Sequence, residues 1–323
     1  MTAPLLEVRE LRTHFLTRAG VARAVDGVSF SLAAGEILGL VGESGSGKSV
    51  TGFSLLGLVD PPGRIVGGSV RFRGQELVGL PERAMRALRG RHIAMVFQDP
   101  QATLNPVLSI GAQMALAVRA HERVSDRAAR ARAAAVLTRV GIPDAARRLD
   151  AYPHEFSGGM RQRVAIATAL LHGPALIVAD EPTTALDVSI QAQILAEMKA
   201  LAAASGTALI WISHDLATVS ALADRVLVMY AGRIVESGPV GAVLRAPLHP
   251  YTRGLLDSLP AMAAPGQRLR QIPGTAPSLL ALREGCAFAP RCPRASPACA
   301  SPPPAATRPG RLALCHHPLE AAA

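Results

Sequence analysis

Short apolar runs alternate with polar, glycine-rich segments along most of the chain, and this pattern predicts an α/β fold. Residues 5–15 and 24–32 alternate between apolar and polar positions, which indicates two strands that pair antiparallel in a small β-layer. Four later runs are almost continuously apolar and are typical of buried strands: residues 37–41, 93–97, 175–179 and 208–212. Because helical spacing follows the last two of these strands, we expect a parallel sheet covered by helices.

Two segments depart from this pattern. Residues 105–140 are rich in Ala, Arg and Leu at helical spacing and predict a helical insert. After Gly238 the periodicity fades, and Pro becomes frequent beyond residue 259. We therefore expect residues 260–323 to form a small, loop-rich appendage with a poor core of its own.

Composition narrows the class of protein. The 323 residues suffice for one large core and a smaller domain. The sequence has no uncharged apolar run of about 20 residues, so we expect no membrane span. The first residues lack the basic and apolar regions of a signal peptide, which predicts a cytosolic location. The net charge is +10, but the Arg residues are scattered and aromatic residues make up only 3%, which indicates solvated surface charge.

The strongest motif follows the predicted strand at 37–41. It fits G-x-x-x-x-G-K-[ST] in full and reads Gly42, Glu43, Ser44, Gly45, Ser46, Gly47, Lys48 and Ser49. A helix is predicted directly after it, at 49–58. In that context the glycines let successive N–H groups face a phosphate, and the helix dipole adds positive charge. Lys48 would reach the β- and γ-phosphates of a nucleotide, and the Ser49 hydroxyl would ligate Mg²⁺.

A phosphate-binding loop alone fits kinases, GTPases, helicases and transporters, and later residues narrow the choice. Asp180 ends an apolar strand, where it could hold Mg²⁺, and Glu181 beside it is placed to act as general base. Ser157, Gly158 and Gly159 begin a predicted helix; they could bind an anion or simply cap that helix. His214 follows another buried strand and could reach a γ-phosphate, although a lone His is usually structural.

All four cysteines lie near the C-terminus, at positions 286, 292, 299 and 315. In a cytosolic chain this clustering favours metal or cluster binding over disulfides. Four thiolates suit zinc or an iron–sulfur cluster, and the C-x2-C pairs common in structural zinc sites are absent. Unligated thiols remain an alternative.

Together these motifs closely resemble the ATP-binding subunit of ABC transporters over most of residues 1–240. The matching motifs are the Walker A loop at 42–49, the Q-loop at 96–100, the signature at 156–162, the Walker B strand ending in Asp180-Glu181-Pro182, the D-loop Ala185-Leu186-Asp187 and the switch His214. The signature departs from the common LSGGQ, with Phe156 and Met160 at its ends, but its Ser-Gly-Gly core is kept.

Finer features resemble the oligopeptide/dipeptide (peptide/nickel) importer branch. They are the stretch at 98–106, the signature form, His249-Pro250-Tyr251-Thr252 and the cysteine-bearing tail. The resemblance implies a P-loop NTPase core of the ABC ATPase type with an antiparallel β-subdomain, a helical subdomain and a small C-terminal extension. The expected domains are 1–98 with 163–240, then 99–162, then 241–323.

The resemblance also implies roles for single residues. Gln98 would ligate Mg²⁺ with Ser49 and Asp180, His214 would hold the γ-phosphate, and Asp187 would link two ATP sites. Phe15 is the expected aromatic for adenine. For Cys286, Cys292, Cys299 and Cys315 the resemblance favours a [4Fe-4S] cluster, with zinc as the alternative.

The implied partners are a second ABC ATPase subunit, two transmembrane permease subunits and an extracytoplasmic solute-binding protein, with no nucleic acid. A heterodimer is expected and a homodimer is the alternative. The subunit would lie peripherally on the cytoplasmic face of the membrane and couple ATP hydrolysis to peptide uptake. Alternative interpretations are uptake of nickel or another small solute, a soluble ABC ATPase acting on nucleic acid or ribosomes, and a non-catalytic regulatory cassette. The intact Lys48, Glu181 and His214 argue against the last.

Overall fold

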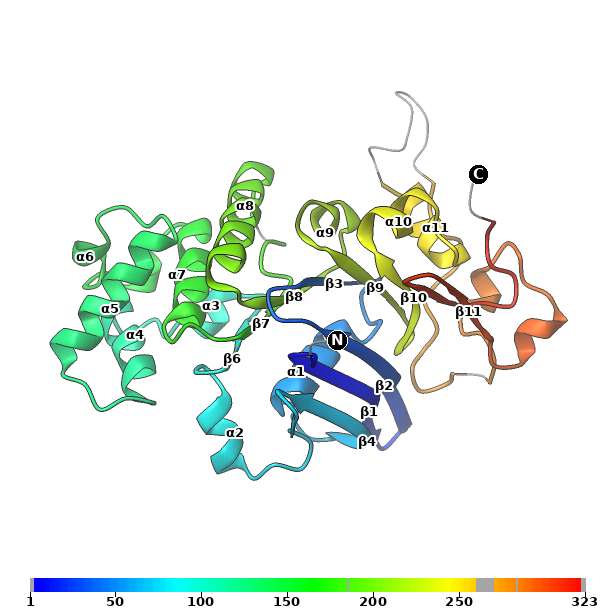
Figure 1. The fold of residues 1–323 in the computed structure, drawn as a ribbon, viewed down its shortest axis with the longest axis horizontal. Helices are drawn as coiled ribbons and strands as arrows, with labels where there is room; N and C mark the ends of the chain where they lie inside the picture. Colours follow the sequence, from blue (N-terminus) through cyan, green and yellow to red (C-terminus); the bar gives the residue numbers. More distant parts are fainter. Residues whose placement is uncertain (1–2, 185, 260–269, 283, 321–323) are drawn as a thin grey trace. The chain divides into compact units, whose positions relative to one another are not determined.

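The computed structural model describes residues 3–184, 186–259, 270–282 and 284–320 (Figure 1). Ala185 of the predicted D-loop therefore lies outside the described residues, as does part of the C-terminal extension. The chain divides into two compact units. The first comprises residues 1–33, 37–78 and 212–323, and the second comprises residues 34–36 and 79–211.

A four-stranded antiparallel sheet begins the first unit, and it confirms the predicted β-layer. Its order is β2-β1-β4-β5, with β1 at Leu6–Thr17, β2 at Gly20–Leu32, β4 at Gly63–Phe72 and β5 at Gln75–Glu76. On β1 Leu6 and Val8 are buried at alternate positions, as the sequence predicts, and a register shift between Val8 and Leu11 then moves the buried positions to Leu11 and Thr13. Thr13 continues this buried face, and its Oγ1 lies 2.8 Å from Ser54 Oγ of helix α1 (Lys48–Leu56).

The other strands of the first unit run in the order β11-β12-β10-β9-β3. Their bounds are β3 Ile37–Val41, β9 Arg225–Tyr230, β10 Arg233–Pro239, β11 Ala305–Arg308 and β12 Arg311–Leu314. All five residues of β3 are buried, and β3 pairs parallel with β9. Besides α1, this unit contains helices α9 (Leu216–Leu222), α10 (Val240–Arg245) and α11 (Pro250–Asp257).

The C-terminal appendage is more ordered than its sequence indicates. We expected a loop-rich appendage and predicted no strand there, yet β12 pairs antiparallel with β10, and β11 completes a hairpin with β12 (Figure 1). The cause is a long-range contact: the fully buried carboxylate of Glu236 on β10 accepts a hydrogen bond from Arg311 Nη2 at 3.0 Å. It also accepts from the backbone N–H groups of Leu248 and His249, at 2.8 and 2.9 Å. A buried carboxylate needs such partners, and they join β10 to the segments that follow it.

The second unit combines strands in the order β8-β7-β6 with most of the helices. The strands are β6 Ile93–Val96, β7 Leu176–Asp180 and β8 Ala208–Ser213, and the division between the units falls within β8. Strands β6 and β7 pair in parallel, as expected for a buried α/β sheet. The helices are α2 Glu82–Leu88, α3 Pro100–Thr103, α4 Ile110–Arg119, α5 Asp126–Arg139, α6 Ala145–Arg148, α7 Gly158–Leu170 and α8 Val188–Ser205.

The predicted helical insert is present as α4 and α5. Both helices begin after a serine, Ser109 or Ser125, whose hydroxyl accepts a hydrogen bond from a backbone N–H in the first turn. Ala129, Ala133 and Leu137 of α5 are fully buried at a spacing of four, which gives this alanine-rich helix its packing face. Within the described residues, no helix has the length and apolar character to cross a membrane.

Candidate nucleotide-binding site

The glycine-rich loop at residues 42–47 joins β3 to α1, in the strand–loop–helix context that its sequence predicts. Backbone atoms of neighbouring segments pack closely against one side of this loop. A Cβ atom added to Gly42 would lie 2.2 Å from the carbonyl oxygen of Met229, and one added to Gly47 would lie 2.1 Å from that of Ala24. Gly47 also has a φ of 104°, which disfavours other residues. At Gly45 no described atom lies within 4 Å of the added Cβ, so this part of the loop faces open space.

The polar groups of the loop are arranged for an anion. Lys48 is buried, and its Nζ donates hydrogen bonds to the carbonyl oxygens of Gly42 and Glu43, at 2.8 and 3.0 Å. The buried Ser46 hydroxyl has no hydrogen-bond partner among the described residues. Helix α1 has Gly47 as its N-cap residue and therefore has no side-chain cap. An unpaired buried hydroxyl and an uncapped helix N-terminus are the groups that a phosphate would satisfy. The loop therefore fits a nucleotide phosphate chain.

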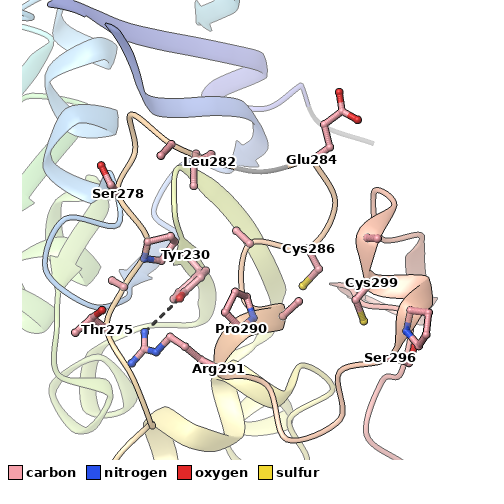
Figure 2. Close-up of a pocket in the computed structure, with 17 residues that line it drawn as sticks. Tyr230, Thr275, Ser278, Leu282, Glu284, Cys286, Pro290, Arg291, Ser296 and Cys299 are labelled. Carbon is pink, nitrogen blue, oxygen red and sulfur yellow. Dashed lines mark hydrogen bonds between the residues drawn. The ribbon is translucent and has the colours of Figure 1, made fainter. Parts of the chain in front are cut away.

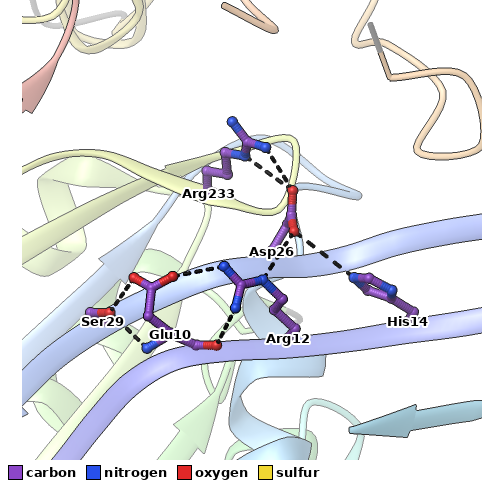
Figure 3. A network of polar contacts seen from close by, with 6 residues as sticks. All are labelled: Glu10, Arg12, His14, Asp26, Ser29 and Arg233. Atoms are coloured by element: carbon purple, nitrogen blue, oxygen red, sulfur yellow. Dashed lines mark hydrogen bonds and ion pairs between the residues drawn. The ribbon is translucent and has the colours of Figure 1, made fainter. Parts of the chain in front are cut away.

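The turn between β9 and β10, in the same unit, supports the loop through backbone hydrogen bonds. The N–H of Gly232 donates to the carbonyl oxygen of Ser46 at 2.9 Å, and the carbonyl oxygen of Gly232 accepts from Asp26 N–H at 2.9 Å. Figure 3 shows how Asp26 is held in turn: its carboxylate binds Arg233 of β10 at 2.8 Å and lies 3.8 Å from Arg12 Nε of β1. The loop thus rests on contacts with β2 and the β9–β10 hairpin.

His14 belongs to the same polar network, and its Nε2 lies 3.9 Å from Asp26 (Figure 3). Burial lowers the pKa of His14, and Asp26 opposes that effect only in part. Next to it on β1 is Phe15, the residue expected to stack on adenine. Phe15 is half-buried, and its Cε1 would lie 2.6 Å from a Cβ added to Gly63. Phe15 therefore packs closely over the start of β4, and its contact with adenine stays a prediction.

Glu43 connects the loop to the C-terminal extension, a contact that the sequence did not indicate. Arg291 donates to the Glu43 carboxylate through Nη1 and Nη2, at 2.6 and 2.9 Å. The N–H of Glu43 donates to the hydroxyl of Tyr251 at 2.8 Å. The Glu43 carboxylate raises the pKa of Arg291, and burial raises the pKa of Tyr251. No local sequence pattern indicates that Arg291 is functional, because a single arginine next to a cysteine can occur in any loop.

The same arginine lines a cavity of about 650 Å³ in the extension. Figure 2 shows Arg291 reaching the Tyr230 hydroxyl, at 3.2 Å, with Cys286 and Cys299 on the cavity wall. All four cysteines are free thiols, and Cys299 and Cys315 are buried. Burial raises the pKa of Cys286 and Cys292, and raises that of Cys315 to about 11.

The expected metal centre is not preformed at these cysteines. In the part of the chain that the structure describes, no three His, Cys, Asp or Glu side chains are grouped so that they could hold a metal ion. The geometry therefore supports neither the iron–sulfur cluster nor zinc. Spacing along the chain could not decide this, because it does not fix the direction of each Cα–Cβ bond.

In the second unit, the structure brings the predicted catalytic residue Glu181 next to Gln98, a predicted Mg²⁺ ligand. Glu181 Oε2 accepts a hydrogen bond from Gln98 Nε2 at 3.3 Å and one from Thr184 Oγ1 at 3.1 Å. The backbone of Glu181 has a φ of 43°, a left-handed conformation that is uncommon outside glycine and often found at functional sites. Asp180, which precedes it at the end of β7, is buried. Sequence reasoning missed Thr184.

The signature residues begin helix α7. Ser157 is its N-cap, and the hydroxyl accepts a hydrogen bond from Met160 N–H at 3.3 Å. The capping interpretation of this serine is therefore correct for the isolated chain. A Cβ added to Gly159 would lie 2.8 Å from Cγ2 of Ile190 on α8, while one added to Gly158 would have only Leu186 within 4 Å, at 3.8 Å. Ser157, Gly158 and Gly159 are all partly or fully exposed.

Two further predicted residues stand at the ends of regular elements. His214 is exposed and directly follows β8; the next residue, Asp215, caps α9 by accepting hydrogen bonds from Ala217 and Thr218 N–H. Asp187 is the N-cap residue of α8, and no side-chain capping bond is formed there among the described residues. The roles assigned to His214 and Asp187 stay predictions.

Comparisons with known proteins agree with this geometry. The ABC transporter family matches residues 25–184, and the family described as oligopeptide/dipeptide transporter, C-terminal region, matches residues 235–299. Among solved structures, the dimeric ATP-binding cassette MJ0796 in a post-hydrolysis state with ADP and phosphate is similar, with a TM-score of 0.66 and 25% identity. That match covers 73% of this chain and 98% of the cassette.

Two curated proteins of Escherichia coli (strain K12) are similar over almost their whole length. The oligopeptide transport ATP-binding protein OppD is 49% identical over 317 residues, covering 98% of this chain and 94% of OppD. The dipeptide transport ATP-binding protein DppD is 46% identical over 318 residues, covering 98% of this chain and 97% of DppD. This chain therefore belongs to the family of ATP-hydrolysing subunits of ABC transporters, in its oligopeptide/dipeptide branch.

Proposed function

We propose that ATP hydrolysis by this chain drives the uptake of dipeptides or oligopeptides through a membrane transporter. The observation that carries the catalytic part is the contact between Gln98 and Glu181, at 3.3 Å. These two residues are 83 positions apart, and the sequence assigned both to the same ATP-hydrolysing site. The peptide part is supported by the likeness to OppD and DppD, whose names state oligopeptide and dipeptide transport.

The first unit would bind the phosphate chain. Lys48 would exchange its bonds to the Gly42 and Glu43 carbonyls for the β- and γ-phosphates, and the loop N–H groups would donate to the same oxygens. Ser46 would find its missing partner there. Ser49, Gln98 and Asp180 are the proposed ligands of Mg²⁺, which when bound offsets the charge of the phosphates. Ser44 and Gly45 would cover the open side.

Glu181 would be the general base that removes a proton from the attacking water. The amide of Gln98 and the hydroxyl of Thr184 hold its carboxylate in place. His214 would donate a hydrogen bond to the γ-phosphate. These assignments rest on the motifs and on the environment of each side chain within its own unit.

A second ATPase subunit would complete the site. Gly158 is exposed, and the described hydrogen bond of the Ser157 hydroxyl is to the turn that it caps. We propose that this turn binds the γ-phosphate held by a partner's loop, and that Asp187 links the two sites. The similar cassette MJ0796 is dimeric. A heterodimer with a related ATPase is our first choice, and a homodimer is the alternative.

The remaining partners follow from the transporter class. We propose two permease subunits in the membrane and an extracytoplasmic solute-binding protein that selects the peptide, with this chain on the cytoplasmic face. Functionally, residues 1–98 and 163–240 would be the ATP-binding core, 99–162 the helical subdomain that contacts the permeases, and 241–323 the extension. Nickel or another small solute is the alternative cargo.

The test is a Glu181→Gln variant in the transporter reconstituted with its partners. We expect it to keep ATP binding while ATP hydrolysis and peptide uptake fall by about 100-fold or more, since a base typically contributes that much. Thr184→Val, which removes only the supporting hydroxyl, is the matched control and should keep most activity. Unchanged ATP turnover in Glu181→Gln would refute the assignment of Glu181 as general base. ATP turnover that is stimulated by nickel and not by peptide would refute the proposal that the transported solute is a peptide.

For the four cysteines we propose a [4Fe-4S] cluster, with zinc as the alternative. The support is chemical: four free thiols lie in an extension with few regular elements. The raised pKa values of Cys286, Cys292 and Cys315 keep these thiols protonated without a cation, so binding must release protons and rotate side chains. Anaerobically purified protein should absorb near 400 nm and lose this band in Cys292→Ser. A colourless, zinc-loaded protein would rule out the cluster.

A further inference from the structure

The phosphate-binding loop of this protein contains a negative charge where it must bind a polyanion. Its two ionisable residues are Glu43 and Lys48, so their charges cancel within the loop itself. Glu43 is partly exposed, with 28% of its side chain accessible to solvent. An unpaired carboxylate there would repel the phosphates of ATP, and the repulsion would be strong because solvent screens it only in part.

Arg291, which lies 248 residues further along the sequence, neutralises the charge of Glu43. Its guanidinium makes two hydrogen bonds with the carboxylate of Glu43, at 2.6 and 2.9 Å, and its side chain is only 6% exposed. A two-point ion pair with a buried arginine is persistent, unlike a pair between two exposed side chains. With Arg291 included, the loop has a net charge of +1.

The arginine is itself held firmly. Nε donates to the carbonyl oxygen of Pro273 at 2.8 Å, and Nη1 also donates to the Tyr230 hydroxyl at 3.2 Å. The guanidinium carbon lies 5.8 Å from the ring centre of Tyr230 and 6.0 Å from that of Phe288. Lysine could not reproduce this planar set of donors. These contacts fix the guanidinium before any nucleotide binds.

Tyr251 acts on the same loop residue from helix α11. Its hydroxyl accepts from Glu43 N–H at 2.8 Å, while the Glu43 carbonyl oxygen accepts from Lys48 Nζ at 3.0 Å. Tyr251 and Arg291 both lie in the region matched by the oligopeptide/dipeptide transporter C-terminal family, and outside the ABC transporter match. The extension thus grips one residue of the loop at both its backbone and its side chain.

We propose that the C-terminal extension completes the ATP site: Arg291 is a positioning residue that neutralises and fixes Glu43, and so sets the affinity of the loop for ATP. This inference rests on the proposed function, because it needs the loop at 42–49 to bind nucleotide phosphates. It assigns the extension a role in nucleotide binding that is independent of any metal at the cysteines.

The test measures binding of a fluorescent ATP analogue with Mg²⁺ to the full-length chain. Arg291→Gln should weaken binding about 10-fold, which corresponds to about 1.4 kcal/mol. The affinity of the double variant Arg291→Gln/Glu43→Gln for ATP should recover to within about 3-fold of that of the wild type, because the carboxylate that repels the phosphates is absent. The loss in Arg291→Gln should also be larger for ATP than for ADP, which has one phosphate fewer.

Arg308→Ala is the matched control, since it removes an exposed arginine of the same extension and should bind ATP as the wild type does. Wild-type affinity in Arg291→Gln would overturn the inference, and so would a double variant as weak as Arg291→Gln. If Arg291→Gln does not fold, the single variant Glu43→Gln provides the test. It should bind ATP at least as tightly as the wild type. Weaker ATP binding by Glu43→Gln would overturn the inference. A wild-type chain that does not bind ATP would refute the proposed function instead.

Discussion

Two helix N-termini in this protein carry serine and glycine, and they differ in what they leave unsatisfied. At α1 the Ser46 hydroxyl is buried without a partner among the described residues, and the helix has no side-chain cap. At α7 the Ser157 hydroxyl caps its own helix by bonding Met160 N–H. The first is an incomplete cradle that needs a ligand, and the second is a complete turn with an exposed surface. We therefore expect similar residue types to give one site that binds phosphate by itself and one that binds it only together with a partner subunit.

The largest expected effect concerns the lysine that only the first turn possesses. Lys48→Ala should weaken ATP binding by about 1000-fold, because it removes a buried charge that would contact two phosphates. Titration with a fluorescent ATP analogue measures this. Lys199→Ala, which changes an exposed lysine on α8, should bind normally. An affinity within about 3-fold of the wild type in Lys48→Ala would mean that the loop binds through its backbone alone.

A second prediction concerns the support that the extension gives to the α1 loop. His249 is buried, and its Nδ1 caps α11 by accepting from Tyr251 N–H at 3.0 Å. Burial lowers the pKa of His249 to about 4, below its unfolded value of about 6.5. The unfolded chain then binds more protons between these values, so stability is full above pH 6.5 and falls as the pH drops towards 4.

The loss should reach up to about 3 kcal/mol at pH 4, since 2.5 pKa units correspond to that free energy. Chemical denaturation of the wild type and of His249→Gln at pH 7.5 and pH 5 measures it. The glutamine variant should lose less stability than the wild type on acidification. An equal loss in both proteins would assign the acid sensitivity to other groups.

The third prediction separates the two turns by function. Gly158→Asp places a carboxylate where the partner's γ-phosphate is proposed to bind. Like-charge repulsion should lower ATP hydrolysis by the assembled transporter about 10-fold, while ATP binding to the isolated chain stays unchanged. Gly67→Asp, where an added Cβ has open space and the backbone is not in the left-handed region, is the control. Weaker ATP binding to the isolated Gly158→Asp chain would contradict the division of roles between the turns.

The smallest expected effect tests most directly the comparison between the serine at the start of α1 and the serine at the start of α7. Ser157→Ala removes a helix cap and should cost about 1 kcal/mol of unfolding free energy. Ser46→Ala removes a hydroxyl without a described partner and should cost less than about 0.5 kcal/mol in the absence of nucleotide. Denaturation of both variants, repeated with saturating Mg-ATP, is the measurement. With ATP present, Ser46→Ala should gain less stability than the wild type; an equal gain would show that Ser46 does not bind phosphate.

Sequence predicted the elements around the ATP motifs because their signals are local. The strand at 37–41, the helix after the loop and the strand ending at Asp180 follow from apolar runs and from glycine positions. Helical spacing after the strand at 208–212 was also recognised, and α9 spans Leu216–Leu222. The strands β11 and β12 were missed, because four residues of RLAL or AATR have too little pattern to distinguish a strand from a loop.

The sequence by itself determined the family and the phosphate-binding loop, because a loop motif needs only its own residues and its flanking strand and helix. It also predicted which residues act on ATP. Only the tertiary structure decided that Glu43 is paired with Arg291, that Tyr251 holds the loop backbone, and that the cysteines are not grouped for a metal. Such pairings join residues more than 200 positions apart. They depend on how the chain packs as a whole, which no local pattern of residues encodes.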